Sequence, residues 1–160
     1  MSGQGGRQPT WSLDLGSLLL LRPLHFRWPA VAQAMLVVDA LNFCFYPEEG
    51  LEYEHLAAGV KQVALSDPGA LSADRLATAD AELVRRLFRW PGTVPLEFER
   101  ARLLREIGAG LIERWGGQTA ALVRAAGGSA RRLVGLVLES FPGFRWVPDG
   151  AGLCERGRQG

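Results

Sequence analysis

The sequence predicts a mainly α-helical domain, and three observations lead to this prediction. Apolar residues recur at three- and four-residue spacing in several segments, polar residues fill the positions between them, and Gly- or Pro-containing turns separate the segments. Such spacing places apolar side chains on one face of a helix, whereas a half-buried strand would show strict alternation. No repeat of fixed period is present. We therefore expect a compact multi-helix domain.

The first predicted helix spans residues 30–41 and follows Pro29, a residue type favoured in the first helical turn. Its apolar positions on one face are Val31, Ala34, Met35 and Val38. The short β-branched run "MLVVDAL" inside it is also compatible with a strand, so both alternatives remain open.

The next helices are separated by turn chemistry. Residues 51–65 form a second helical segment, which ends at the turn sequence Asp67-Pro68-Gly69. Ser72 is the predicted N-cap of a short helix in "SADRLATA", and Thr78 is the predicted N-cap of another in "TADAELVRRLFRW". Pro91-Gly92 ends the latter.

Residues 95–115 form the clearest helix of the sequence. Apolar residues recur every fourth position, and the positions between them carry acids and arginines that can pair along the helix surface. Its opening residues Glu97, Glu99 and Arg100 are assigned a structural role, since acids in a first turn suit the helix dipole. Gly116-Gly117 ends it. A helix at 119–126 and one in "SARRLVGLVLESF", capped by Ser129 and ended by Pro142, complete the pattern.

Composition and charge restrict the class of protein. The 160 residues are 48% hydrophobic and 22% charged, as in ordinary globular domains, and the net charge of +1 gives no field that would attract nucleic acid. The apolar run 18–21 is far shorter than the ~20 residues that span a bilayer, and no signal peptide is recognisable. Cys44 and Cys154 are expected to be reduced thiols. We expect a cytoplasmic protein with no membrane partner.

The segment 37–46, "VVDALNFCFY", is the candidate site. It places Asp39 and Asn42 in an apolar run beside the rings of Phe43, Phe45 and Tyr46. One interpretation is a ligand pocket in which the polar groups bind and the rings form walls. The other is structural: buried polar groups satisfy backbone donors near a helix end, and the rings belong to the core. The sequence alone leaves both open.

Four blocks of sequence resemble one known family. They are "MLVVDALNFCFY", "LEYEHLAAGVKQVAL", "PLEFERARLLREIGAGLIERWGG" and "GSARRLVGLVLESFPGFR", in this order. Together they are similar to the queuosine salvage protein family. This resemblance implies hydrolysis of the N-glycosidic bond of queuosine 5'-phosphate, which releases queuine for tRNA modification. It also implies a mainly α fold similar to that of helix-hairpin-helix DNA glycosylases.

The resemblance also implies site residues and boundaries. His25 matches a histidine that the family uses at its substrate pocket. Together with Asp39, Asn42 and Phe43 of the matched block "MLVVDALNFCFY", it is a predicted substrate-binding residue. The catalytic residue is unknown, because the family's candidate aspartate lies in a C-terminal half that this chain is expected to lack. The predicted domains are therefore a flexible or loop-rich segment at 1–23, the helical queuosine-salvage-like domain at 24–145, and a non-family tail at 146–160.

Two functions remain as hypotheses. The first is the N-glycosyl hydrolase, acting on a nucleotide substrate without a cofactor and without a metal, since no Cys/His cluster has metal-ligand spacing. The chain by itself is then expected to be inactive or unstable. The alternative is a non-catalytic helical module that binds nucleic acid or a protein, although the near-zero net charge makes nucleic acid a less favoured partner.

Overall fold

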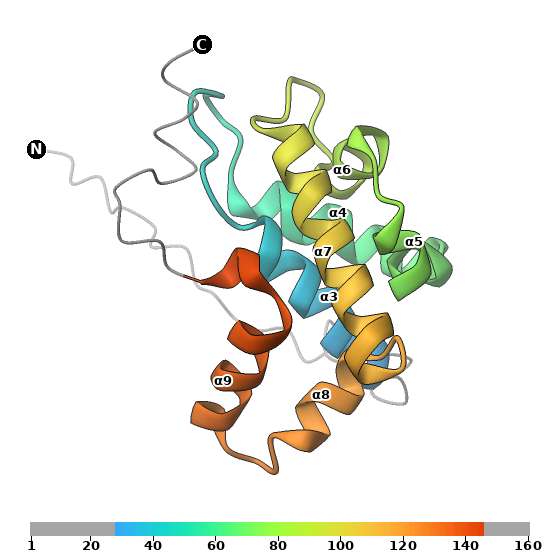
Figure 1. Cartoon of the computed structure of the whole chain (residues 1–160). Helices are drawn as coiled ribbons and strands as arrows, with labels where there is room; N and C mark the ends of the chain where they lie inside the picture. Colours follow the sequence, from blue (N-terminus) through green and yellow to red (C-terminus); the bar gives the residue numbers. More distant parts are fainter. Residues whose placement is uncertain (1–27, 146–160) are drawn as a thin grey trace, which may run out of the picture.

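The computed structural model describes residues 28–145, and this part of the chain contains helices and no strand. The mainly α prediction is therefore confirmed, and the strand alternative for "MLVVDAL" is wrong. Along the chain the helices are α3 (Trp28–Leu41), α4 (Tyr53–Ser66), the 3-10 helix η1 (Pro68–Leu71), α5 (Ala73–Ala77), α6 (Ala81–Phe88), α7 (Glu97–Trp115), α8 (Thr119–Ala125), α9 (Ala130–Ser140) and the 3-10 helix η2 (Pro142–Phe144) (Figure 1).

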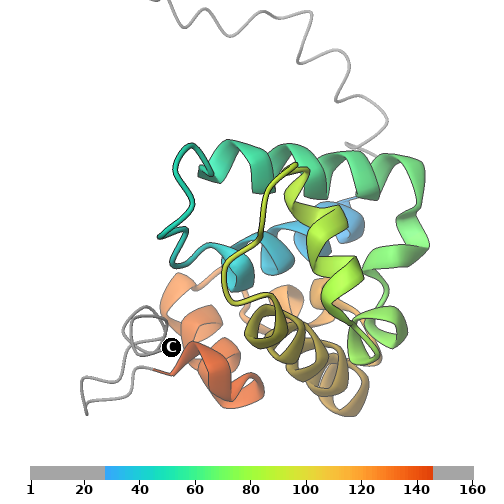
Figure 2. The same cartoon turned by 90° about the horizontal axis from the view of Figure 1, so that it is seen from above.

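The long helix α7 organises the packing. It contacts α3, α5, α6, α8, α9 and η2 (Figure 1). Seen from above, α3 and α6 lie between α4 and α7 (Figure 2). One continuous core fills the space between these helices, and apolar residues of α9 are only partly buried against it. Its largest fully buried apolar side chains include Phe88, Phe141, Leu41, Leu56, Leu76, Leu87, Leu104, Ile107, Leu111 and Leu122.

Two glycines allow pairs of helices to pack so closely that the backbone of one lies against the backbone of the other. A Cβ atom at Gly59 on α4 would lie 2.1 Å from the carbonyl oxygen of Leu87 on α6. At Gly108 on α7 it would lie 2.2 Å from the backbone nitrogen of Ala77 on α5. Any side chain at these positions would force the helices apart, so glycine determines how closely α4 meets α6 and α7 meets α5.

The helix ends confirm some predicted signals and correct others. The Ser129 side chain accepts a hydrogen bond from the Arg132 backbone N–H at 3.3 Å, as expected of an N-cap. Gly116, with a φ of +58°, ends α7 in the left-handed conformation. Ser72 occupies the N-cap position of α5 but makes no capping bond.

Thr78 is not the N-cap of α6. It ends α5 instead, and its hydroxyl donates back to the carbonyl oxygens of Asp74 and Arg75. Asp80 caps α6 by accepting from the Leu83 N–H at 2.9 Å. The prediction failed because Thr78 and Asp80 are both good capping residues, and the sequence does not say where the turn between two short helices closes.

The predicted domain boundaries at 23/24 and 145/146 involve residues outside the described range, so the division stays a prediction. Within residues 28–145, no helix combines the length and the apolar character needed to cross a membrane.

Candidate functional site

The segment 37–46 forms the end of α3 and the turn that follows it. Val37, Val38, Ala40 and Leu41 are buried, whereas Asp39 and Asn42 are on the exposed side of the chain. The acid therefore lies on an exposed face of α3, close to the end of the helix. Neither its carboxylate nor the Asn42 amide makes a hydrogen bond to any residue from 28 to 145, which argues against the interpretation that they satisfy backbone donors.

A small pocket lies beside Asp39. It has a volume of about 170 Å³, and Asp39, Ala40 and Phe43 line it from the end of α3. The opposite wall belongs to α7 and to η2, and its residues are Leu103, Glu106, Ile107, Gly143 and Phe144. The structure thus brings Asp39 and Phe43 into one hollow. Partial burial raises the pKa of the Asp39 carboxyl above its usual value, because the charged form loses hydration.

Glu106 places a second carboxylate in this pocket. Its position in the sequence predicted only that it belongs to the polar surface of the helix. One oxygen, Oε1, accepts a hydrogen bond from the backbone N–H of Gly143, which attaches η2 to α7. The other oxygen, Oε2, lies 3.3 Å from Nη1 of Arg102, one turn earlier on α7. The i, i+4 spacing of Arg102 and Glu106 was the only signal in the sequence. Glu106 therefore fixes the pocket wall.

Arg100 supports the pocket from within the core, although it does not line it. The side chain is fully buried and its guanidinium donates to four backbone carbonyls, those of Pro95, Leu41, Phe43 and Cys44. Leu41 is the last residue of α3, and Phe43 and Cys44 come just after it. At such a helix end, carbonyl groups lack helical partners and the helix dipole is negative. Arg100 therefore replaces the missing capping groups of α3.

Aromatic rings surround the same guanidinium. Its carbon atom lies 4.3 Å from the ring centroid of Phe43, 4.7 Å from that of Phe88 and 5.7 Å from that of Phe45. Burial lowers the pKa of Arg100 to about 10, so the side chain is still cationic at neutral pH. Its structural role was expected, but its burial was not.

Several predicted wall residues lie elsewhere. Phe45 packs edge-on against Phe88, with 6.1 Å between ring centroids, and so belongs to the core side of the turn. Tyr46 is largely exposed and lines no part of the pocket beside Asp39. Asn42 is exposed and also absent from the pocket lining. His25 lies outside the described residues.

The prediction of a reduced Cys44 is wrong, because this residue takes part in a disulfide bond. Cys44 has a φ of +40° and follows Phe43 directly, so the disulfide is attached to the turn that Arg100 holds.

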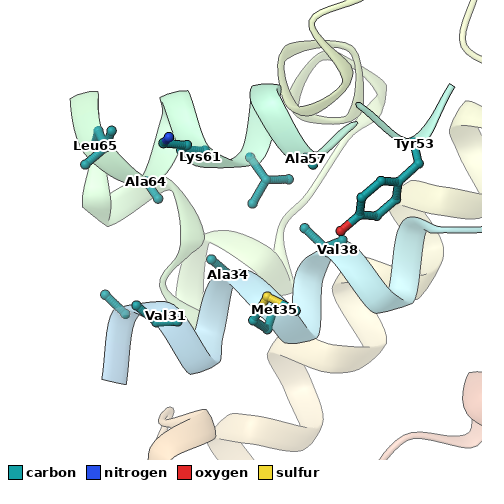
Figure 3. A pocket seen from close by; sticks show the side chains of 11 residues that line it. Val31, Ala34, Met35, Val38, Tyr53, Ala57, Lys61, Ala64 and Leu65 are labelled. Carbon is teal, nitrogen blue, oxygen red and sulfur yellow. The ribbon is translucent and has the colours of Figure 1, made fainter. Parts of the chain in front are cut away.

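A second hollow, which Asp39 does not line, lies between α3 and α4. It is larger, about 400 Å³, and nearly all its lining is apolar (Figure 3). Among residues 28–145 its lining includes no carboxylate and one cation, that of Lys61, so this part of the chain does not supply there the carboxylates that glycosidic chemistry needs. Within residues 28–145, no group of three or more His, Cys, Asp or Glu side chains is arranged to hold a metal ion.

The structure shows a helical domain with a small pocket that a carboxylate and an aromatic ring help to line. The chain belongs to the queuosine salvage protein family, whose model matches residues 24–150. It is 40% identical over 115 residues to a queuosine 5'-phosphate N-glycosylase/hydrolase of Dictyostelium discoideum, an alignment that covers 71% of this chain and 35% of that protein.

Two further relatives carry the same description. A protein of Sphaerobacter thermophilus is 36% identical over 151 residues, which are 87% of this chain and 44% of the relative. One of Mus musculus is 34% identical over 126 residues, which are 69% of this chain and 37% of the relative. The chain thus spans less than half the length of the curated relatives that it matches.

Proposed function

We propose that this chain forms part of a queuosine 5'-phosphate N-glycosylase, and that the pocket between Asp39 and Phe43 binds one portion of the nucleotide. The observation that carries the proposal is that an exposed carboxylate, which makes no hydrogen bond within residues 28–145, and an aromatic ring line one hollow of a queuosine salvage family member. The names of the relatives support the substrate.

The chemistry assigns complementary roles to the two side chains. Cleavage of an N-glycosidic bond develops positive charge on the ribose ring, and a carboxylate nearby stabilises that charge. A ring such as that of Phe43 can hold a planar base and exclude water from one side. Asp39 then faces either the ribose or a polar edge of the base, where its oxygens accept hydrogen bonds.

The size of the pocket argues that it is one part of a larger site. Pockets for drug-sized ligands usually measure about 300–1,000 Å³, whereas this one measures about 170 Å³. We infer that His25 and residues corresponding to the unmatched length of the relatives complete it and supply the catalytic acid. The likeness of the fold to helix-hairpin-helix DNA glycosylases belongs to the same proposal.

Because the pocket is only one part of the proposed site, a specific behaviour is expected of the 160-residue chain. It should bind queuosine 5'-phosphate without releasing queuine, because the pocket accommodates only part of the reacting molecule. Titration calorimetry measures binding, and mass spectrometry of the incubation mixture detects free queuine. Asp39→Asn should weaken binding about tenfold, the effect of about 1.4 kcal/mol that a hydrogen bond to a charged group contributes.

The matched control is Glu113→Gln. Glu113 is an exposed acid on α7 that lines neither hollow, so this variant should bind like the parent chain. Equal affinities for all three proteins would exclude Asp39 from the site. Salt-sensitive binding of tRNA or DNA with no affinity for the nucleotide would favour the alternative, a non-catalytic binding module.

The cytoplasmic location also remains a proposal, to be tested by cell fractionation. A disulfide at Cys44 is uncommon in reducing compartments. The oxidation state of Cys44 in protein extracted with a thiol-blocking reagent would therefore check the same proposal.

A further inference from the structure

The hollow between α3 and α4 is an apolar groove that remains uncovered in the described part of the chain. Val31, Ala34, Met35 and Val38 form its α3 wall, and Ala57, Val60, Ala64 and Leu65 form much of its α4 wall (Figure 3). Figure 3 shows Met35 and Tyr53 directed into the space between the two helices. Met35 is 51% exposed and Tyr53 is 43% exposed.

Such exposure indicates a partner, since monomeric proteins seldom leave a contiguous apolar surface open to water. We propose that this groove is a docking site for the chain's own N-terminal segment, residues 18–24, which read "LLLLRPL". This inference concerns assembly of the domain and is independent of the proposed function.

The position of the segment in the chain is the first argument. The α3 wall begins at Ala30, only two residues after Trp28, where α3 starts. Seven Cα–Cα steps separate Leu21 from Trp28, and fully extended they span up to about 24 Å. The α3 wall from Ala30 to Val38 is about 12 Å long at the rise of an α-helix. The segment can therefore reach every part of the groove, at the high effective concentration of a tethered ligand.

Chemistry is the second argument. Four consecutive leucines match a groove whose lining is almost entirely aliphatic. Burial of a leucine side chain contributes favourably in proportion to the apolar area removed from water. The one cation of the described lining, Lys61, lies at the groove (Figure 3), and the leucine run itself carries no charge that would oppose it.

The size of the groove favours this occupant over a second copy of the chain. A volume of about 400 Å³ accommodates a few large side chains. Stable interfaces between proteins bury about 800 Å² on each partner, which needs a much broader surface. A short tethered segment is therefore the better fit.

A photo-cross-linking experiment on the full chain tests the proposal directly. A benzophenone amino acid replaces Met35 in the groove. In the control protein it replaces Val134, which is 58% exposed on α9 and lines neither hollow. After irradiation, the Met35 probe should cross-link within the same molecule to peptides from residues 11–27, and the Val134 probe should not. Cross-links between molecules, or cross-links that avoid residues 11–27, would overturn the proposal.

A labelling experiment tests the same contact without a probe in the groove. Because Lys61 is the only lysine, its rate of acetylation reports on one side chain of the groove. Leu20→Asp should raise this rate about threefold to tenfold by undocking the segment.

The control for labelling is Leu153→Asp, the same change at the other end of the chain, which should leave the rate at Lys61 unchanged. Met35→Asn should also raise the rate, and adding it to Leu20→Asp should have little further effect, since both variants break one contact. An unchanged rate in Leu20→Asp, or equal effects of Leu20→Asp and Leu153→Asp, would refute docking of residues 18–24.

Discussion

Arg100 on α7 and Phe43 after α3 contact each other through both backbone and side chain. The guanidinium donates a hydrogen bond of 2.6 Å to the Phe43 carbonyl oxygen, and its carbon atom lies 4.3 Å from the centroid of the Phe43 ring. The residue that forms one wall of the pocket is thus held by a cation in the core. Four tests follow from this contact and from the other features of the fold.

Arg100→Met should lower the free energy of unfolding by about 3–5 kcal/mol. The change removes the donor from four backbone carbonyls, and methionine cannot replace it. Urea unfolding followed by circular dichroism measures the loss. Arg102→Met is the matched control on the same helix. Its exposed pairs with Glu99 and Glu106 contribute about 1 kcal/mol or less. Similar losses in both variants would mean that the carbonyl bonds of Arg100 are not important.

Gly108→Ala should destabilise the domain by about 1–3 kcal/mol, because the added methyl group meets the backbone of α5 and forces two core helices apart. Gly135→Ala makes the same change in the middle of α9, where an added Cβ has no neighbour within 4 Å. That variant should gain about 0.5–1 kcal/mol through helix propensity. Thermal unfolding of both distinguishes the effects, and a stabilised Gly108→Ala protein would contradict the close approach.

Ser129→Ala should cost about 1 kcal/mol, since it removes the acceptor of the Arg132 N–H at the start of α9. Ser72→Ala is the corresponding change at the start of α5, where the serine makes no capping bond, and should cost a few tenths of a kcal/mol at most. Hydrogen exchange of the first-turn amides of each helix measures local opening. Equal effects at the two serines would show that the capping bond of Ser129 is not formed in solution.

Asp39→Asn should change how stability depends on pH. Burial raises the pKa of the folded carboxyl, so the folded state holds this proton more tightly than the unfolded state. The stability linked to this proton is therefore present at low pH and is lost as the pH rises from about 3.9, the unfolded value, through the raised folded value. Asparagine does not titrate and avoids this loss.

The difference in melting temperature between Asp39→Asn and the parent chain should accordingly increase in favour of Asp39→Asn as the pH rises from 3 to 6. Glu113→Gln supplies the baseline for removing a carboxylate from an exposed position of a helix. A gain that is independent of pH, or one that shrinks as the pH rises, would contradict the shift at Asp39.

Local sequence was sufficient to predict most helices, because their signals are short-range. The apolar spacing of residues 95–115 and the pair Gly116-Gly117 specify α7, and its last helical residue is Trp115 as expected. Ser129 is the N-cap of α9, and the helix ends at Ser140, two residues before Pro142. Where two capping residues stood close together, as at Thr78 and Asp80, local chemistry was ambiguous and only the packing of α5 and α6 decided the boundary.

The site was less predictable. The pattern of residues 37–46 grouped Asp39, Asn42 and Phe43 as site residues, and the structure brings Asp39 and Phe43, but not Asn42, into one pocket. The pattern did not separate Phe43 from Phe45, whose ring packs on Phe88. Nor did it indicate Glu106, because the contact with Gly143 joins residues 37 positions apart.

The sequence by itself determined most of the helices and placed an acid and aromatic residues close together near residue 41, because those properties depend on neighbours within one or two turns. Only the tertiary structure decided that Arg100 is buried. Its place between Glu99 and Ala101 resembles that of any surface arginine, and its partner Phe43 lies 57 residues earlier in the chain. A buried cation requires acceptors on every side, and these exist only when the end of α3 and the start of α7 pack together.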